Sequence, residues 1–343
     1  MRILVVAPSW IGDALLAQPL FARLRAQHPD ATIEAIAPPW TAPVLRRMPE
    51  LNAVIDAPFE HGALRLIERW QLARDLAKRS YDAAIVLPNS FKSALIPWLA
   101  RIPMRIGFVG EQRYGVLNVR HRLDEQRLPL MAERYAKLAE PTTSMPHRPL
   151  AASSIRIDPA NRAQTLQRLS LNVDRRIVAF CPGAEFGPAK RWPVRHFAAL
   201  ARALAAIDRQ IWLFGGPKDR AITAEIVESA DGACTDLAGR TDLAGAIDLM
   251  SYASAVVSND SGLMHVAAAL GRPLVALYGS SSPAHTPPLA ADAQILSLTI
   301  ECSPCYAREC PLGHFRCLND LDPIRVLHAI EQAEKIHAQR ASH

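Results

Sequence analysis

An aspartate stands where an early hydrophobic segment gives way to a helix. The run RILVVAP (2–8) is short and rich in β-branched residues, as expected for a buried strand. Gly12 and Asp13 follow it at the start of helical spacing in APSWIGDALLAQPL. A carboxylate at the end of a strand can take a proton from a substrate hydroxyl, and it can also cap the next helix. The local sequence favours the cap.

The block VVSNDSGLMHVAAALG (256–271) joins a strand, a polar turn and the start of a helix. The free amides at that helix start suit a phosphate, and Gly262 lets a ligand approach the backbone closely. His265 could donate to the same ligand, whereas Asp260 suits sugar hydroxyls better than phosphate. Capping by Asn259 or Asp260, with His265 on the surface, explains the same residues equally well.

Two glycine-bearing loops follow other predicted strands. In CPGAEFGPAKRWP, Lys190 could reach a diphosphate as a point charge, although a solvated lysine before the next helix is the ordinary alternative. In FGGPKD, Gly215 and Gly216 allow a tight turn, and Asp219 is well placed to cap the following helix. The local sequence favours that capping role for Asp219 over a role in a nucleotide site.

Four of the six cysteines lie together in CSPCYARECPLGHFRC (302–317). Thiolates this close can enclose one tetrahedral zinc ion, although their spacing matches no common zinc pattern. Reduced thiols in a loop are the alternative, and disulfides are disfavoured in a cytoplasmic chain. The other two, Cys181 and Cys234, are expected in or beside buried strands. The candidate zinc ligands are Cys302, Cys305, Cys310 and Cys317.

Three common catalytic motifs are missing from the sequence. No G-x-G-x-x-G follows the first strand, and neither G-x-x-x-x-G-K-[ST] nor G-x-S-x-G occurs. Dinucleotide-dependent oxidoreductases and P-loop kinases are therefore disfavoured.

Strands and helices alternate through both halves of the chain, which is typical of parallel sheets with crossover helices. The predicted strands are 2–8, 31–38, 52–58, 81–88, 175–185, 209–219, 253–262 and 272–280. The predicted helices are 13–28, 63–79, 194–206, 219–230, 242–251, 261–270 and a last helix from Asp322 to about Gln339. Two domains suit 343 residues. Ligands of such domains bind beyond the carboxyl ends of the strands, so the default site is a cleft between the domains.

The Pro-, Ser- and Thr-rich stretch EPTTSMPHRPLAASS (140–154) is the natural linker between domains at 1–150 and 151–321. The net positive charge comes from the first half: residues 1–150 hold 20 Lys+Arg and 14 Asp+Glu, and residues 151–343 hold 19 of each. A solvated rim or a surface for an anionic partner explains this excess. No nucleic-acid-binding motif accompanies it, so no nucleic-acid partner is expected.

No apolar run approaches the roughly 18–20 residues that span a bilayer, and no signal peptide is recognisable. We therefore expect a cytoplasmic protein that at most touches a membrane surface.

These segments together resemble the ADP-heptose:lipopolysaccharide heptosyltransferases of glycosyltransferase family 9. The G-D pair near the start and the N-D-S-G-x-x-H block are specific to that family, and similar segments run along nearly the whole chain. The N-S-x-K-S stretch (89–93) and the cysteine-rich segment favour its type II branch. The resemblance implies a GT-B fold, with two Rossmann-like doubly wound domains facing across a cleft. The acceptor would bind the first domain and the donor the second, and the helix 322–343 would pack back on the first.

The resemblance also implies the reaction. L-glycero-D-manno-heptose would move from ADP-heptose to the first heptose of the inner core on Kdo2–lipid A, with inversion at the anomeric carbon. Asp13 becomes the expected general base, and Lys190 with the helix amides would meet the charge of ADP, so that catalysis needs no metal. The expected donor site is Gly183, Ala184, Lys190, Gly215, Gly216, Asp219, Asp260, Ser261, Gly262 and His265. The expected acceptor site is Gly12, Asn89, Lys92, Arg113, Arg120 and Arg122.

The basic first half would then meet the anionic acceptor and touch the anionic cytoplasmic face of the inner membrane. Within the family, a type I or later-core heptosyltransferase is the alternative. From other classes, the alternatives are a GT-B-fold nucleotide-sugar epimerase and a sugar-nucleotide-binding protein without catalysis.

Overall fold

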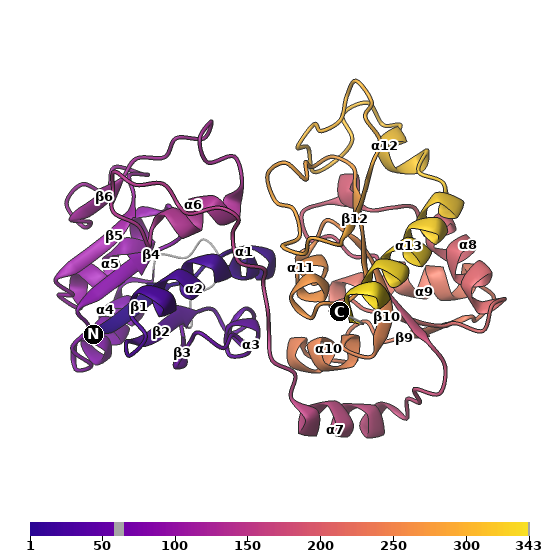
Figure 1. The fold of residues 1–343 in the computed structure, drawn as a ribbon, viewed down its shortest axis with the longest axis horizontal. Helices are drawn as coiled ribbons and strands as arrows, with labels where there is room; N and C mark the ends of the chain where they lie inside the picture. Colours follow the sequence, from indigo (N-terminus) through magenta and orange to yellow (C-terminus); the bar gives the residue numbers. More distant parts are fainter. Residues whose placement is uncertain (58–64, 342–343) are drawn as a thin grey trace. The chain divides into compact units, whose positions relative to one another are not determined.

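The chain folds into two compact α/β units, Met1–Ile155 and Arg156–His343 (Figure 1). The structure is a computed structural model that describes residues 1–57 and 65–341. The unit boundary lies close to the predicted boundary at 150. The end of the predicted linker belongs to the first unit, because the Ser154 amide donates to Gln18 Oε1 (2.8 Å) and Gln18 Nε2 donates to the Ser154 carbonyl (2.6 Å).

The first unit contains a six-stranded parallel sheet in the order β3-β2-β1-β4-β5-β6. The strands are β1 (Arg2–Val6), β2 (Thr32–Ala37), β3 (Ala53–Asp56), β4 (Ala83–Val86), β5 (Met104–Phe108) and β6 (Val119–His121). In the centre, β1 pairs with β2 from Arg2↔Thr32 and with β4 from Ile3↔Ala83. Apolar runs such as β1 and β4 are buried by helices on both faces, as parallel strands require.

The helices of the first unit form two packed groups, one of α4 with α5 and the other of α1, α2, α3 and α6. They are α1 (Ile11–Leu16), α2 (Gln18–Gln27), α3 (Ala42–Leu45), α4 (Leu66–Ala77), α5 (Phe91–Leu99) and α6 (Met131–Lys137). The single helix predicted at 13–28 is in fact two, separated at Ala17. Pro19 has no amide proton to donate to the preceding turn, so the helical ladder is interrupted there. The first residues of the helix predicted at 63–79 lie outside the described residues.

The second unit repeats the plan with the strand order β12-β11-β10-β7-β8-β9, all parallel. The strands are β7 (Ile177–Cys181), β8 (Gln210–Leu213), β9 (Cys234–Asp236), β10 (Ala253–Asn259), β11 (Leu274–Tyr278) and β12 (Gln294–Ser297). Cys181 and Cys234 are buried in β7 and β9, which confirms their predicted place. All four strands predicted in this half are present, although each is shorter than its apolar run.

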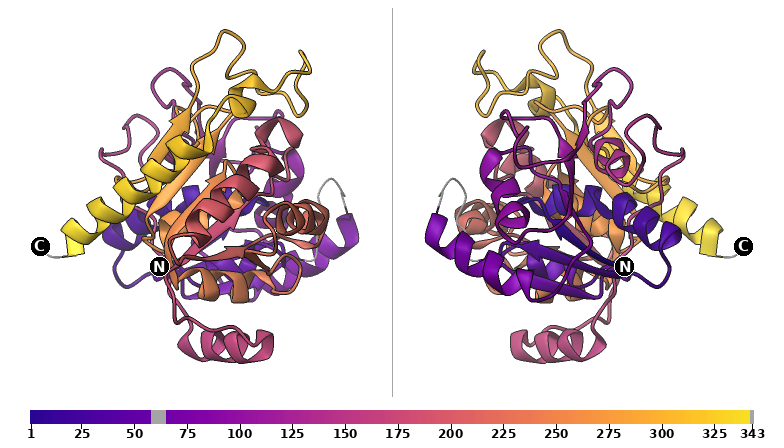
Figure 2. Two further views of the ribbon diagram at one scale, coloured as in Figure 1. Left: turned by 90° about the vertical axis from the view of Figure 1, so that its right-hand side faces the viewer. Right: turned by 90° about the vertical axis from the view of Figure 1, so that its left-hand side faces the viewer.

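The helices of the second unit include a long C-terminal one. They are α7 (Pro159–Leu169), α8 (Val194–Ala205), α9 (Arg220–Ser229), α10 (Leu243–Met250), α11 (Gly262–Ala269), α12 (Arg316–Asn319) and α13 (Pro323–Ala341), with 3₁₀ turns η1 (Pro188–Lys190) and η2 (Pro217–Asp219). Helix α13 packs on α8 and on β10, β11 and β12 (Figure 2). It buries Val326 and Ile330 in the core of this unit. Its packing on the first unit stays a prediction. Among the described helices, none is long and apolar enough to cross a membrane.

Candidate active site

Each sheet reverses its strand order at one point, and most of the predicted site residues lie near these two points. In the first sheet β1 and β4 are neighbours although two strands separate them along the chain, and in the second sheet the same holds for β7 and β10. Loops leaving two such strands diverge to opposite sides and leave a crevice at the carboxyl ends. The reversal point of each unit is therefore the expected place for a ligand.

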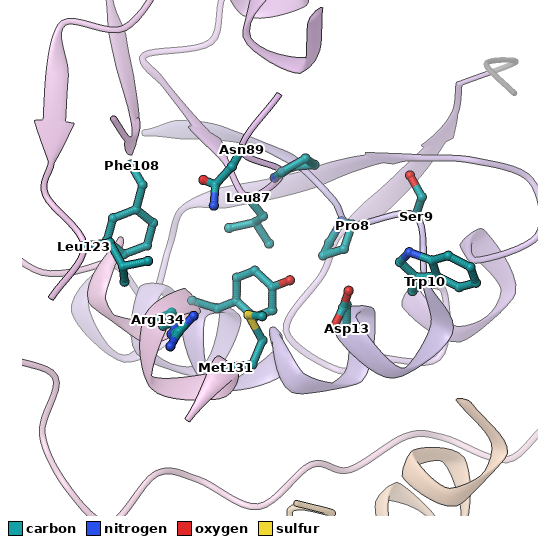
Figure 3. Close-up of a pocket in the computed structure, with 12 residues that line it drawn as sticks. Pro8, Ser9, Trp10, Asp13, Leu87, Asn89, Phe108, Leu123, Met131 and Arg134 are labelled. Atoms are coloured by element: carbon teal, nitrogen blue, oxygen red, sulfur yellow. The ribbon is translucent and has the colours of Figure 1, made fainter. Parts of the chain in front are cut away.

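In the first unit, a cavity of about 240 Å³ lies at the ends of β1 and β4. Its lining is Pro8, Ser9, Trp10, Asp13, Leu87, Pro88, Asn89, Phe108, Leu123, Met131, Arg134 and Tyr135. Figure 3 shows Asp13 pointing from the first turn of α1 toward Pro8 and the cavity. The predicted pair Asp13 and Asn89 is thus brought together from two different strand ends.

Asp13 is the third residue of α1, and Gly12 is the second. Trp10 holds the N-cap position with extended backbone, so Asp13 is not the N-cap residue that the local sequence favours. A carboxylate in the first turn is still favoured by the helix dipole, which stabilises its charged form. The carboxylate thus lines the cavity from the first turn of α1.

Helix α6 contributes two polar side chains that the sequence analysis missed. Arg134 and Tyr135 line the same cavity as Asp13. Burial, assisted by the negative charge of Asp13, raises the pKa of Tyr135 well above its usual value, so its hydroxyl stays protonated. Arg134 donates from Nε to the Leu128 carbonyl (2.9 Å), which holds the guanidinium in place. No sequence motif marks these residues, because α6 comes from a segment without clear periodicity.

Arg113 was expected at the acceptor surface, and this prediction is wrong. Its side chain is completely buried. The guanidinium donates to the Pro88 carbonyl (2.7 Å), to Asn89 Oδ1 (3.2 Å) and to the Phe108 carbonyl. Burial lowers the pKa of Arg113 to about 10, which still leaves it charged at neutral pH. Arg113 therefore positions the loop after β4, including Asn89, rather than meeting a ligand at the surface.

The remaining predicted acceptor residues, Lys92, Arg120 and Arg122, do not line the Asp13 cavity. Lys92 lines a second cavity of about 330 Å³ at the ends of β1, β2 and β4, which shares Ser9 and Asn89 with the first. Arg120 and Arg122 are exposed in and after β6, outside the lining of both cavities. Their contact with an acceptor stays a prediction.

In the second unit, Asn259 ties the end of β10 to the loop that follows β7. Its Oδ1 accepts from the Trp192 amide (3.0 Å), and its Nδ2 donates to the Pro182 carbonyl (2.7 Å). These bonds fix the start and the end of the loop that carries Lys190. Asn259 is thus a positioning residue, a role that the sequence analysis did not assign.

The Lys190 ammonium forms an ion pair with Asp260, with 2.5 Å between Nζ and Oδ2. Ser281 donates its hydroxyl to the same carboxylate oxygen, also at 2.5 Å. Lys190 also lies over the ring of Phe186, 5.0 Å from its centre. The two residues predicted for diphosphate and for sugar therefore meet, and Ser281 is an addition.

Ser261 and Gly262 begin α11 beside this pair. Ser261 is the N-cap with extended backbone and makes no side-chain cap bond, so capping by Asn259 or Asp260 is not what the structure contains. His265 is buried rather than on the surface. Burial lowers its pKa to about 4, with a further contribution from Lys190 that Asp260 opposes, so the ring is neutral at pH 7.

The glycines of the two remaining loops make room for Asp219. A Cβ on Gly183 would lie 2.5 Å from the Asp219 carboxylate, and one on Gly215 would lie 2.8 Å from its Cβ. Asp219 occupies the N-cap position of α9 but makes no side-chain bond to that helix, and it accepts instead from the Gly216 amide (2.9 Å). Its predicted capping role is therefore wrong. Ala184, in the same region, is buried.

The cysteine-rich segment packs against the Lys190 loop. The Ala189 amide donates to the Arg308 carbonyl (3.0 Å), and Ser303 Oγ donates to the Gly279 carbonyl (2.7 Å). Gly187 has φ +156°, and a Cβ there would lie 2.4 Å from the Arg308 carbonyl oxygen. The segment thus supports the turn that presents Lys190.

The four clustered cysteines and His314 line one small cavity of about 20 Å³. Cys302 Sγ lies 3.9 Å from His314 Nε2, and the Phe315 amide donates to Cys310 Sγ (3.4 Å), which lowers the pKa of that thiol. Over residues 1–57 and 65–341, however, no three His, Cys, Asp or Glu side chains are arranged to hold a metal ion. A structural zinc at Cys302, Cys305, Cys310 and Cys317 stays a prediction.

Comparison with known proteins decides the family. Residues 69–316 match the model of glycosyltransferase family 9 (heptosyltransferase). The chain belongs to this family. It is 45% identical to lipopolysaccharide heptosyltransferase 2 of Escherichia coli (strain K12), over 95% of this chain and 97% of that one. It is 44% identical to lipooligosaccharide heptosyltransferase 2 of Haemophilus ducreyi, over 97% and 99%.

This chain is also similar to a solved structure of a heptosyltransferase. The structure described as E. coli ADP-heptose lps heptosyltransferase II superposes with a TM-score of 0.88 at 43% identity, covering 98% of this chain and all of that one. The family 9 protein described here is thus a glycosyltransferase with the two doubly wound domains of the GT-B fold, as the resemblance implied.

Proposed function

We propose that this family 9 enzyme transfers L-glycero-D-manno-heptose from ADP-heptose to the first heptose of the lipopolysaccharide inner core. The observation that carries the proposal is the 45% identity, over nearly the whole chain, to an enzyme named lipopolysaccharide heptosyltransferase 2. ADP-heptose as donor is supported by the name of the E. coli structure that is 43% identical. The acceptor is then a heptosylated Kdo2–lipid A.

Asp13 is the proposed general base. The acceptor hydroxyl oxygen attacks the anomeric carbon of the donor while its proton passes to the Asp13 carboxylate. The bond between that carbon and the β-phosphate oxygen breaks, ADP leaves, and the anomeric configuration inverts. The protonated hydroxyl of Tyr135 and the cation of Arg134 lie in the same cavity, where they suit the oxygens of an anionic core sugar.

Lys190 is the proposed partner of the departing diphosphate. Its ammonium is only partly exposed and is held by Asp260, so it is oriented before substrate arrives. The amides at the start of α11, near Ser261 and Gly262, present the positive ends of their dipoles to an anion as well. Charge and dipoles fixed in advance are commonly the largest contribution to such catalysis.

Asp260 has a second role in this scheme. When the Lys190 ammonium pairs with the diphosphate in place of Asp260, the Asp260 carboxylate can accept hydrogen bonds from the heptose hydroxyls. This is the role that the sequence predicts for Asp260. The neutral ring of His265 can donate one N–H to the same ligand without adding charge. The glycine loops around Asp219 would line the nucleotide site.

Lys190 and the α11 amides are proposed to stabilise the negative charge of the departing ADP. The transfer is therefore proposed to need no metal cofactor. The enzyme is proposed to act in the cytoplasm, at the inner face of the membrane that holds its acceptor. The positive charge of residues 1–150 suits the carboxylates and phosphates of that acceptor.

An assay of ADP release tests the proposal. Purified enzyme with ADP-heptose is given Kdo2–lipid A with no heptose or with one heptose. Release is expected only with the heptosylated acceptor. Equal release with the acceptor that lacks heptose would contradict the type II assignment, and conversion of ADP-heptose without any acceptor would point to an epimerase.

A further inference from the structure

An exposed apolar cluster marks one edge of the first unit. Ile67 has 71% of its surface exposed, Leu66 55%, Trp70 49% and Phe91 42%. The first three belong to the first two turns of α4, and Phe91 is the first residue of α5. We call these four residues the apolar rim. Large apolar side chains gathered in this way commonly mark an interaction surface.

The apolar rim adjoins the second cavity of the first unit. Arg69, between Ile67 and Trp70 on α4, donates to the Lys92 carbonyl at the start of α5 (3.1 Å), so the first turns of the two helices are tied together. Arg69 and Lys92 both line the cavity at the ends of β1, β2 and β4. The rim therefore stands beside a cavity that shares lining residues with the Asp13 cavity.

The sequence of α4 and its ends has an excess of basic residues, although the acidic Glu111 accepts from the Phe91 amide of the rim (2.7 Å). Residues 65–79 contain five basic residues and two acidic ones. The Arg74 guanidinium lies over the ring of Trp70, 4.8 Å from its centre. A helix with an apolar tip, a tryptophan and flanking cations is the pattern of segments that lie in the headgroup region of anionic bilayers.

We propose that the apolar rim docks on an anionic lipid bilayer, with Ile67 and Trp70 entering the headgroup region. The inference rests on the proposed function, because an acceptor built on lipid A has to be taken from a membrane. A sugar anchored by its lipid reaches only a short way from the bilayer, so the surface beside the acceptor cavity has to approach it. The rim is an exposed apolar surface beside the second cavity, which shares lining residues with the Asp13 cavity.

Vesicle co-sedimentation of the full chain, without substrates, tests the proposal. The vesicles are phosphatidylcholine alone, or phosphatidylcholine with about 30% phosphatidylglycerol as the anionic lipid. The wild-type chain is expected to bind the anionic vesicles, and more weakly at high salt. The double variant Ile67→Ser, Trp70→Ser should bind them at least about ten-fold more weakly.

Ile324→Ser is the matched control. Ile324 is also the second residue of a helix, α13, and has 62% of its surface exposed, but it belongs to the second unit. Its variant is expected to bind vesicles like the wild type. The conservative pair Ile67→Leu, Trp70→Phe should keep binding, which separates loss of apolar surface from misfolding.

Three outcomes would overturn the inference. The first is a wild-type chain that does not bind anionic vesicles, and the second is equal vesicle binding by the Ser double variant. The third is a wild-type chain that is a dimer by size-exclusion chromatography and a double variant that is a monomer but binds vesicles equally well. The last would make the rim a contact between copies of the chain. Because the assay contains neither donor nor acceptor, a failed ADP-release assay contradicts the proposed function alone.

Discussion

Lys190 and Asp260 form an ion pair of 2.5 Å although they lie 70 residues apart in the sequence. Lys190 closes the loop after β7, and Asp260 directly follows β10, so the pair spans the reversal point of the second sheet. The carboxylate holds the lysine where a diphosphate would need it. Ser281, bonded to the same oxygen, fixes the carboxylate in turn.

Replacing Lys190 by Met should lower kcat by about 10²- to 10³-fold, because a preorganised cation that meets the leaving diphosphate is lost. Lys218→Met is the control, since Lys218 forms an ion pair with Glu185 (2.7 Å) but is exposed. Steady-state ADP release measures both variants. Similar rates for the two would remove Lys190 from the chemistry.

Asp13→Asn should lower kcat by about 10²- to 10⁴-fold, because the amide cannot accept the acceptor proton. The free energy of unfolding should change by no more than about 1 kcal/mol, the size of a first-turn charge effect. Asp75→Asn, at an exposed site of α4, serves as the control. A near-normal rate for the Asp13 variant would contradict its role as base.

Arg113→Met should reduce the free energy of unfolding by about 3 kcal/mol, because the buried carbonyls of Pro88 and Phe108 lose their charged donor. Arg120→Met, at an exposed position, should change it by no more than about 0.5 kcal/mol. Denaturant titration compares them. If the two variants were equally stable, Arg113 would not be the support of the Asn89 loop.

Stability should fall in mild acid because of two buried histidines, His121 and His265. Burial lowers the pKa of each to about 4, assisted at His121 by the charge of Lys137, from 6.5 in the unfolded chain. Below about pH 6.5 the unfolded chain binds protons that the folded one does not. Each histidine should thus lower the free energy of unfolding by about 2 kcal/mol between pH 7 and pH 5.

His121→Leu tests this pH dependence. Neither ring nitrogen of His121 has a hydrogen-bond partner among the described residues, so an apolar side chain of similar size is tolerable there. The variant should show about half of the stability change that the two histidines cause, measured by denaturant titration at pH 7 and pH 5. An unchanged pH dependence would show that His121 does not titrate as its burial implies.

Heptosyl transfer should persist after dialysis against EDTA, because Lys190 and the α11 amides are proposed to stabilise the negative charge of the leaving diphosphate. ADP release before and after dialysis measures this. Loss of activity that magnesium restores would contradict it.

Elemental analysis of the undialysed protein separates zinc at the four clustered cysteines from reduced thiols, since only the former gives about one equivalent of zinc.

Local sequence determined most of the secondary structure. Strands such as β1, β7 and β10 are apolar runs that end at Pro, Gly or polar turns, and these patterns depend only on near neighbours. Asp13, Lys190 and Asp260 were predicted in the segments that follow strands for the same reason. Short edge strands such as β6 and β12 were missed, because pairing partners rather than their own residues stabilise them.

Tertiary structure decided what these side chains contact. Nothing near Arg113 in the sequence indicates that it is buried beneath the loop after β4, and nothing near Ser281 indicates Asp260. Asp219 looks like a helix cap locally, but Gly183 and Gly215 from other segments leave space for its carboxylate beside them. A hydrogen bond depends on distance in space, and segments far apart in the chain meet only when the sheet has assembled.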